Sequence, residues 1–339
     1  MNVSAPYQII AGYANAELRP SKSLLITAGA RLDHWILKKD QVDIDGNPIP
    51  TQDFTSVNPR IAIISKPTPT DVIKLMGGKA FRAPTVYEYD YTDGGISQVA
   101  SSANPNKLVP ETVYSGELEY THRFNRDWSL LGSIYETYAQ DIIQSVPVPQ
   151  SLIDAHNANP MFSPWANGVE YYANSTVPIN ITGVDFELRK EWRAGTMFMA
   201  TYGYLQARYT NDRNGMEPNT HTPNAPTQYA SIRGVTPLVP NLVNGAIRVT
   251  LEDERRLNDS TDVNSKRAII ADVVLSGRIA RYGLKYAFGV YNLFNWQYAE
   301  PVNGYTTPAM PQAGRSLMFN LLYTQAVGSQ SKSSQSTAQ

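Results

Sequence analysis

Aromatic side chains are the residues of this 339-residue sequence with the clearest potential for ligand chemistry. Nine of them gather in three segments without a regular strand or helix pattern: Tyr87, Tyr89 and Tyr91; Trp165, Tyr171 and Tyr172; Trp296, Tyr298 and Tyr305. Aromatic rings give a bulky chelate or sugar a large and rigid contact area. We therefore predict that these residues bind a small molecule, with packing between loops as the equally balanced alternative.

Arg82 stands just before the first of these segments. A guanidinium at this point could pair with an anionic ligand. The more common role for an arginine in such a place is to tie its own strand to the following loop. Arg82 is retained as a candidate ligand-binding residue with both roles open.

Residue types that could catalyse reactions are present, but not in catalytic patterns. The histidines are scattered: His34, His122, His156 and His221. Gly77-Gly78-Lys79 precedes no helical segment, so it does not predict a phosphate loop. Glu117 and Glu119 share one face of a predicted strand and fit charges inside a barrel better than a catalytic pair. We predict no enzyme activity, no catalytic residue, no metal site and no cofactor.

Composition narrows the class of protein further. The net charge of −1 gives no strong electrostatic field, so no nucleic-acid partner is predicted. The sequence has no cysteine, which excludes disulfides and thiolate metal sites. No run of 18 apolar residues predicts a transmembrane helix. Residues Met1 to Ile10 lack the basic and apolar regions of a secretory signal.

Hydrophobicity alternates with a period of two along most of the chain, which is typical of strands with one wet face. Within residues 113–124 only His122 interrupts the apolar face, and within 183–192 Lys190 is the exception. The pattern predicts thirteen strands, at 7–19, 23–37, 54–66, 71–82, 111–124, 128–145, 179–192, 196–210, 226–236, 241–254, 267–280, 282–295 and 315–324.

Connections between the predicted strands are alternately short and long. The long ones cover 38–53, 83–110, 146–178, 211–225, 255–266 and 296–314. An up-and-down barrel in the bacterial outer membrane has this pattern, with tight periplasmic turns at one rim and long loops at the other. We predict an all-β, antiparallel up-and-down meander, a partial transmembrane barrel over residues 1–326. The Ser/Gln-rich segment 327–339 is predicted to be disordered.

The same reasoning predicts which face each residue occupies. Charged residues predicted on the concave, lumenal side are Glu117, Glu119, Asp185, Glu187, Arg189 and Asp272. Apolar residues predicted on the outward, lipid-facing side are Leu118, Tyr120, Val184, Phe186, Leu188, Val273, Leu275, Phe319 and Leu321. Rings near strand ends are predicted to form an interfacial girdle: Trp35, Phe81, Phe124, Trp128, Trp192, Tyr209, Tyr282, Phe294 and Tyr323.

Several segments, in order along the chain, resemble the TonB-dependent outer-membrane receptor family. They are Tyr13-Ala14-Asn15-Ala16-Glu17-Leu18-Arg19-Pro20 with Gly29-Ala30-Arg31-Leu32-Asp33, Asn58-Pro59-Arg60, Gly78-Lys79-Ala80-Phe81-Arg82-Ala83-Pro84-Thr85, Asn106-Lys107-Leu108-Val109-Pro110-Glu111, Gly183-Val184-Asp185-Phe186-Glu187, Asn292-Leu293-Phe294-Asn295 with Tyr298, and Gly314-Arg315. The resemblance spans about residues 13–324. It implies a barrel in the bacterial outer membrane that takes up a scarce ligand such as a ferric siderophore, cobalamin or an oligosaccharide.

The family pattern also includes a signal peptide, a plug domain and earlier strands, none of which is evident here. The resemblance implies that the plug links the receptor to the inner-membrane TonB system. An odd number of strands cannot close an antiparallel barrel, so we expect open edges near 7–19 and 315–324. The alternatives are a non-functional remnant, a small porin-like channel and an outer-membrane hydrolase.

Overall fold

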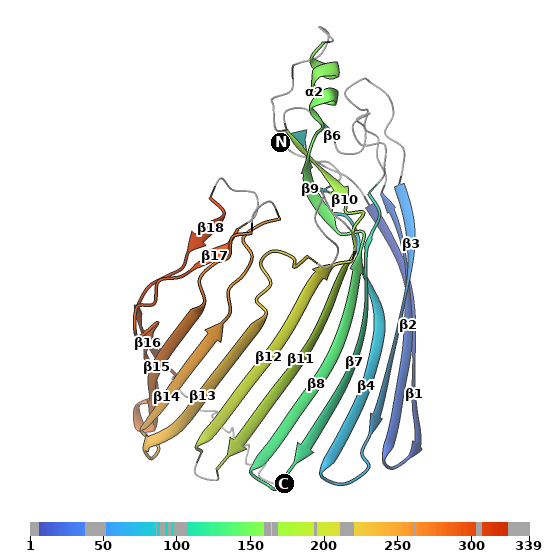
Figure 1. Ribbon diagram of the computed structural model, residues 1–339. Coiled ribbons are helices and arrows are strands. Elements are labelled where there is room, and N and C mark those ends of the chain that lie inside the picture. Colours follow the sequence, from blue (N-terminus) through green and yellow to red (C-terminus); the bar gives the residue numbers. More distant parts are fainter. Residues whose placement is uncertain are drawn as a thin grey trace, which may run out of the picture.

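A single antiparallel sheet dominates the computed structural model (Figure 1). The structure describes residues 7–37, 52–85, 87–88, 92–93, 96–97, 108–158, 164, 169–192, 195–210, 220–259, 262–302 and 307–324. Thirteen strands pair in sequence order, so the predicted meander is confirmed. The helices in these ranges are all too short or too polar to cross a membrane.

The strands of this sheet follow the alternating pattern closely. They are β1 (Tyr7–Ser21), β2 (Leu24–Leu37), β3 (Gln52–Ser65), β4 (Asp71–Arg82), β7 (Glu111–Arg123), β8 (Trp128–Gln140), β11 (Ile179–Glu191), β12 (Met197–Tyr209), β13 (Gln228–Val239), β14 (Val243–Glu252), β15 (Ala268–Ile279), β16 (Leu284–Tyr291) and β19 (Ser316–Tyr323). One predicted strand, 128–145, ends early. Asp141 has a positive φ of 57°, which separates β8 from the next strand.

Short and long connections lie at opposite ends of the sheet (Figure 1). The long ones contain secondary structure that the sequence pattern did not predict: β5 (Thr92–Asp93), β6 (Ile96–Ser97), β9 (Ile143–Pro147), α2 (Gln150–Asn157), β10 (Glu170–Asn174), β17 (Ala299–Pro301) and β18 (Ala309–Pro311). These elements pair within their own loops and not with the main sheet. Each of these strands has only two to five residues, too few for a period of two to stand out, and α2 has only eight.

All six predicted lumenal charges lie on one face of the sheet. Glu119 and Asp185 are both cross-strand partners of Ser133. Arg248 and Asp272 are cross-strand partners on that same face, and the residue Asp272 is only 4% exposed. Side chains crowd together on the concave side of a curved sheet, so this burial identifies the lumenal face.

The opposite face is apolar and open. Leu118, Ile134 and Val184 are partners across three strands of this face. Phe186 on the same face is 49% exposed. Exposed apolar surface on this scale marks an interaction with a partner or a membrane. The predicted apolar positions of β15 and β19 share this outward face, because Leu275 and Phe319 are both partners of Phe288.

Glycines on the lumenal face make room for tyrosines. A Cβ atom at Gly183 would lie 2.4 Å from the ring of Tyr135, and one at Gly203 would lie 2.2 Å from the ring of Tyr229. The Tyr229 hydroxyl donates a 2.5 Å hydrogen bond to Asp185. The contact with Tyr135 explains in physical terms why a glycine occupies position 183 within β11.

Two rings of the predicted aromatic girdle, Trp35 and Tyr209, lie on the lumenal register and not on the outward face. Tyr209 is 4% exposed, and its hydroxyl donates hydrogen bonds to Asp259, so it belongs to the packed loop end. Trp35 stacks between Tyr7 and Phe54, and the strand pairing places it on the lumenal face. Strand propensity, and not a membrane interface, accounts for rings at these two positions.

The sheet does not close on itself. β1 and β19 each have one neighbour in the sheet, and every described side chain of both strands is exposed. Both strands run from the loop end to the turn end, since Tyr7 pairs beside the loop after Leu37 and Tyr323 pairs beside the turn before Leu284. Strands of equal direction cannot form an antiparallel pair. An even number of strands is required, so closure needs an odd number of further strands.

Candidate functional site

Arg82 joins three segments at the loop end of the sheet. Its guanidinium donates hydrogen bonds to both carboxylate oxygens of Glu111, at 2.6 and 2.7 Å, and to Glu88 at 2.9 Å. Glu88 also accepts a 2.7 Å hydrogen bond from the Thr85 backbone N–H. Glu111 accepts one from the Ile143 N–H at 2.8 Å. This arrangement ties β4 to the loop after it and to β7, whereas an anion-binding role for Arg82 remains a prediction.

Charge stabilises the ionised form of Glu88. Burial alone would raise the pKa of this carboxyl, but the hydrogen bonds from Arg82 and Thr85 outweigh burial and lower its pKa below 4.5. A lowered pKa in the folded state means that the contact stabilises the fold fully above about pH 4.5. That contribution is lost as pH falls through the folded-state pKa.

We expect Glu88→Gln to loosen the loop after β4 at neutral pH while leaving the sheet intact. The neutral amide cannot replace a charge-assisted bond to Arg82. Limited proteolysis within 83–110 should become faster in the variant at pH 7. Wild type should show the same increase only below about pH 4.5. Equal cleavage of both proteins at pH 7 would show that the contact with Glu88 does not hold the loop.

Two of the predicted ligand-binding rings meet at this same rim. Tyr87 and Tyr172 pack edge to face with ring centroids 6.1 Å apart. Tyr87 is 60% exposed, whereas Tyr172 is half-buried. Burial raises the pKa of the Tyr172 hydroxyl, and the nearby Tyr87, Glu88 and Glu170 raise it further. Tyr172 therefore offers a neutral hydroxyl, and both rings offer apolar surface close to the Glu88 carboxylate.

Tyr171 has a different role from its neighbour. It packs against the small apolar cluster of Val148, Ile153 and Val169, which holds α2 against the β9–β10 hairpin. Asn174 fixes the base of this hairpin, since its side-chain amide bonds to both backbone groups of Val109 at 2.8 and 2.9 Å. The loop between β8 and β11 is thus a folded structure with its own core.

Trp296 and Tyr298 lie in another loop, between β16 and β19. The Trp296 indole N–H donates to the Arg267 carbonyl at 3.1 Å. Burial raises the pKa of the Tyr298 hydroxyl, with a further rise from Glu300. Asn292 organises this loop, because it accepts a hydrogen bond from the Trp296 N–H and its own backbone N–H donates to Asp272.

The structure therefore brings some predicted residues together and separates others. Arg82, Tyr87 and Tyr172 form one cluster around Glu88, and Tyr171 lies behind it. Trp296 and Tyr298 belong to a loop several strands away along the sheet (Figure 1). Four predicted residues lie outside the described residues: Tyr89, Tyr91, Trp165 and Tyr305. Sequence reasoning missed Asn174, for which the alternating pattern carries no signal.

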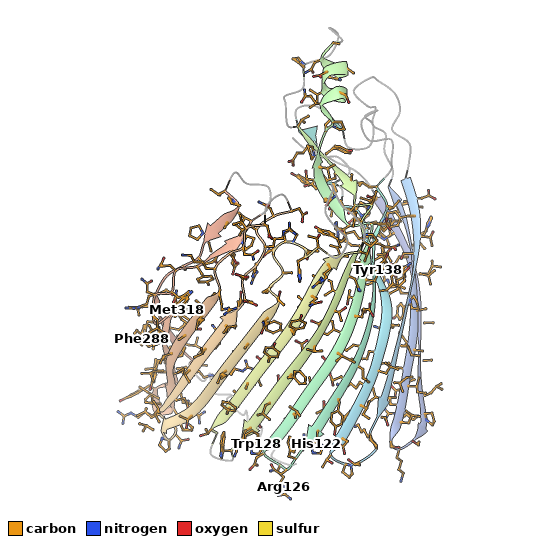
Figure 2. All side chains as sticks on the ribbon, in the orientation of Figure 1. His122, Arg126, Trp128, Tyr138, Phe288 and Met318 are labelled. Atoms are coloured by element: carbon orange, nitrogen blue, oxygen red, sulfur yellow. The ribbon has the colours of Figure 1, made fainter. Side chains whose placement is uncertain are left out.

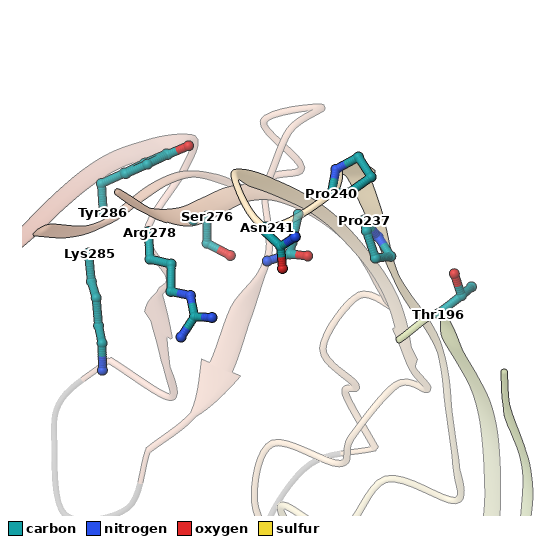
Figure 3. A pocket seen from close by; sticks show the side chains of 10 residues that line it. Thr196, Pro237, Pro240, Asn241, Ser276, Arg278, Lys285 and Tyr286 are labelled. Atoms are coloured by element: carbon teal, nitrogen blue, oxygen red, sulfur yellow. The ribbon is translucent and has the colours of Figure 1, made fainter. Parts of the chain in front are cut away.

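A second surface lies on the lumenal face at the turn end. A hollow of about 760 Å³ is lined by Ser276, Arg278, Lys285, Asn241 and neighbouring residues (Figure 3). Arg278 and Lys285 are direct cross-strand partners, an arrangement of like charges that costs stability. No carboxylate is among the residues that line the hollow. It is suited to an acidic group from another segment inside the barrel.

Catalytic and metal chemistry find little support in this arrangement. The Glu119 carboxylate forms an ion pair with Lys74 at 2.6 Å, as expected for a structural lumenal charge. Gly77 and Gly78 lie within β4, where the Gly78 backbone passes close to Pro59. Within the described ranges no group of three His, Asp or Glu side chains could hold a metal ion.

An apolar outer face, a charged inner face and loops sorted by length define an outer-membrane type of β-barrel. A sequence profile of the TonB dependent receptor-like β-barrel family matches residues 4–293. The chain belongs to the TonB-dependent receptor family. Members of this family are outer-membrane β-barrels that act as receptors and transporters, not enzymes. No curated protein matches the chain at a significant level.

Solved receptors share the fold at low sequence identity. The ferric preacinetobactin receptor BauA from Acinetobacter baumannii has a TM-score of 0.65 at 13% identity, with 93% of this chain and 42% of that one covered. The copper transporter OprC gives 0.69 at 14%, covering 93% and 48%. The ferric yersiniabactin receptor FyuA from Yersinia pestis gives 0.66 at 15%, covering 93% and 45%. The chain thus spans less than half the length of these receptors.

Proposed function

We propose that this chain is the barrel portion of an outer-membrane receptor that takes up a scarce ligand, with a ferric siderophore as the leading class. Cobalamin or an oligosaccharide are the other classes considered. The observation that carries the proposal is that folded hairpins at the loop end of the sheet present aromatic and acidic side chains together. Glu117, Glu119 and Glu187 lie on mid-strand positions of the concave face, away from these loops.

Ligand contact is assigned to exposed and half-buried rings at this end. Tyr87 and Tyr172 offer adjacent ring surfaces from two different loops. The 40% exposed Trp296 offers another. Large, rigid rings bind a bulky chelate with little loss of side-chain entropy. The remaining predicted ligand-binding residues are Arg82, Tyr89, Tyr91, Trp165, Tyr171, Tyr298 and Tyr305.

A partner segment is part of the proposal. The open edges of β1 and β19 require an odd number of further strands, and the basic hollow around Arg278 and Lys285 suits acidic groups of a plug. Through that plug the receptor would engage the inner-membrane TonB system. Residues 1–326 are proposed as the barrel portion, and the predicted tail, 327–339, lies outside the described residues.

Two copies of this chain are a poorer solution to the open edges. Copies inserted in the same orientation would place β1 of one beside β19 of the other in parallel, because both strands run from the loop end to the turn end. A small porin made of such copies would break the antiparallel ladder twice. This disfavours the porin alternative relative to a complementary segment.

The test is ligand binding by the chain combined with a segment that supplies plug and preceding strands from a family member. Probes are Fe³⁺ complexed with a catecholate and Fe³⁺ citrate. Alanine at Tyr87, Tyr172 or Trp296 should weaken binding of the preferred complex by about 1–3 kcal/mol at a central contact.

Glu117→Gln is the matched control, because Glu117 lies on a mid-strand lumenal position. Its affinity for the complex should equal that of wild type. Normal binding by all three alanine variants would contradict the proposal. A combined receptor that inserts but binds neither probe nor any oligosaccharide would favour the remnant alternative.

A further inference from the structure

His122 and Lys190 are polar side chains on the apolar outward face near the turns, and they have different kinds of partner. His122 approaches Asp71 with its Nδ1 atom at 2.7 Å from the carboxylate, and the Tyr120 hydroxyl also donates to Asp71 at 2.7 Å. This group is therefore satisfied internally. Among the residues that the structure describes, none forms an ion pair with the ammonium of Lys190.

Lys190 instead lies between two indole rings. Trp128 is its direct cross-strand partner, and Trp192 lies two residues further along the same face. The ammonium is 4.6 Å from the ring centroid of Trp128 and 4.4 Å from that of Trp192. Two rings within this range hold a cation in a fixed place. The rings cannot accept all three of its N–H donors in line, so the ammonium can still donate to a further acceptor.

Lys190, Trp128 and Trp192 together form a cage, and this cage lies where the apolar surface of β11 ends and the turn begins. Leu188, two residues towards the loop end, begins the apolar surface, and the turn after Trp192 begins on the other side. Figure 2 shows Trp128 beside the turn that carries Arg126, an exposed cation. An outward-facing lysine costs roughly 2–4 kcal/mol at the bilayer midplane but about 0–1 near its surface. The cage thus lies at the level of lipid headgroups.

We propose that Lys190, Trp128 and Trp192 form a binding site for the phosphate of an anionic phospholipid in the turn-side leaflet. The inference rests on the proposed function, which places the outward face in a membrane. The ammonium supplies the charge, the indoles position it, and the apolar surface around Leu188 receives the acyl chains. The same turn carries the exposed side chains of Arg126 and Asp127, whose opposite charges leave Lys190 as the cation that faces the lipid.

The test uses the full chain in nonionic detergent micelles that contain either phosphatidylglycerol or phosphatidylcholine with brominated acyl chains. Bromine quenches tryptophan fluorescence at close range. Wild type should reach half-maximal quenching at a roughly fivefold lower fraction of phosphatidylglycerol than of phosphatidylcholine. Lys190→Gln should abolish this preference, and Lys190→Arg should retain most of it.

Lys66→Gln is the matched control, since Lys66 is an exposed lysine beside another turn. It should keep the fivefold preference. Three outcomes would overturn the site. The preference for phosphatidylglycerol could survive in Lys190→Gln, or it could be lost equally in Lys66→Gln. Added inorganic phosphate could also remove it. Equal quenching by both lipids would refute the site alone, whereas no quenching by either would refute membrane placement and with it the proposed function.

Discussion

Replacing Asn292 with alanine is expected to lower the free energy of unfolding by about 2–4 kcal/mol. Its side chain makes hydrogen bonds with both backbone groups of Trp296 and with the Ala313 carbonyl, and it is 4% exposed. Its φ of 50° adds a conformational cost for alanine. Denaturant unfolding of the complemented barrel in detergent measures the change.

Asn292→Gly separates the two causes. Glycine accepts a positive φ without strain, so this variant should lose only the hydrogen bonds and be about 1 kcal/mol more stable than the alanine variant. If both variants unfold like wild type, the loop before β19 does not depend on Asn292. If they are equally destabilised, the backbone conformation contributes nothing.

Phe186→Arg is expected to destabilise the membrane-inserted barrel by about 2–4 kcal/mol. Phe186 lies in the middle of β11 on the outward face, and its ring covers Gly132. A guanidinium there would face hydrocarbon at mid-depth. The measurement is equilibrium unfolding in lipid vesicles, followed by tryptophan fluorescence.

Thr201→Arg is the control, because Thr201 is the cross-strand partner of Glu187 on the lumenal face. An opposite-charge pair across strands is neutral or slightly stabilising. Thr201→Arg should therefore unfold within about 1 kcal/mol of wild type. A larger loss for Thr201→Arg than for Phe186→Arg would mean that the outward and lumenal faces have been exchanged.

Much of the fold could be predicted from the sequence because its signals are local. Alternation in 183–192 sets both the strand and its faces, since successive side chains of a strand point to opposite sides. The alternation of short and long connections predicted the meander, and the segments that resemble the receptor family predicted the class of protein. Even the open edges followed from counting strands, because an odd number cannot close an antiparallel sheet.

Other features depend on contacts between residues far apart in the chain. The partners of Arg82 include Glu111, 29 residues away, and no local pattern reveals which carboxylate a guanidinium will meet. The β9–β10 hairpin is joined by Asn174 to Val109, 65 residues away. Two predicted rings of one loop therefore separate: Tyr172 packs against Tyr87 of another loop, whereas Tyr171 packs against the apolar cluster of its own loop.

The sequence by itself determined three things: the strands, the face of the sheet that each side chain occupies, and the protein family. All three follow from the order of apolar and polar residues along each strand. Only the tertiary structure decided which exceptions to that order matter. His122 and Lys190 are equal irregularities in sequence, yet one meets Asp71 and the other meets two indoles. The physical reason is register: the residue opposite each side chain is set by strand pairing, which the order of residues in one strand does not contain.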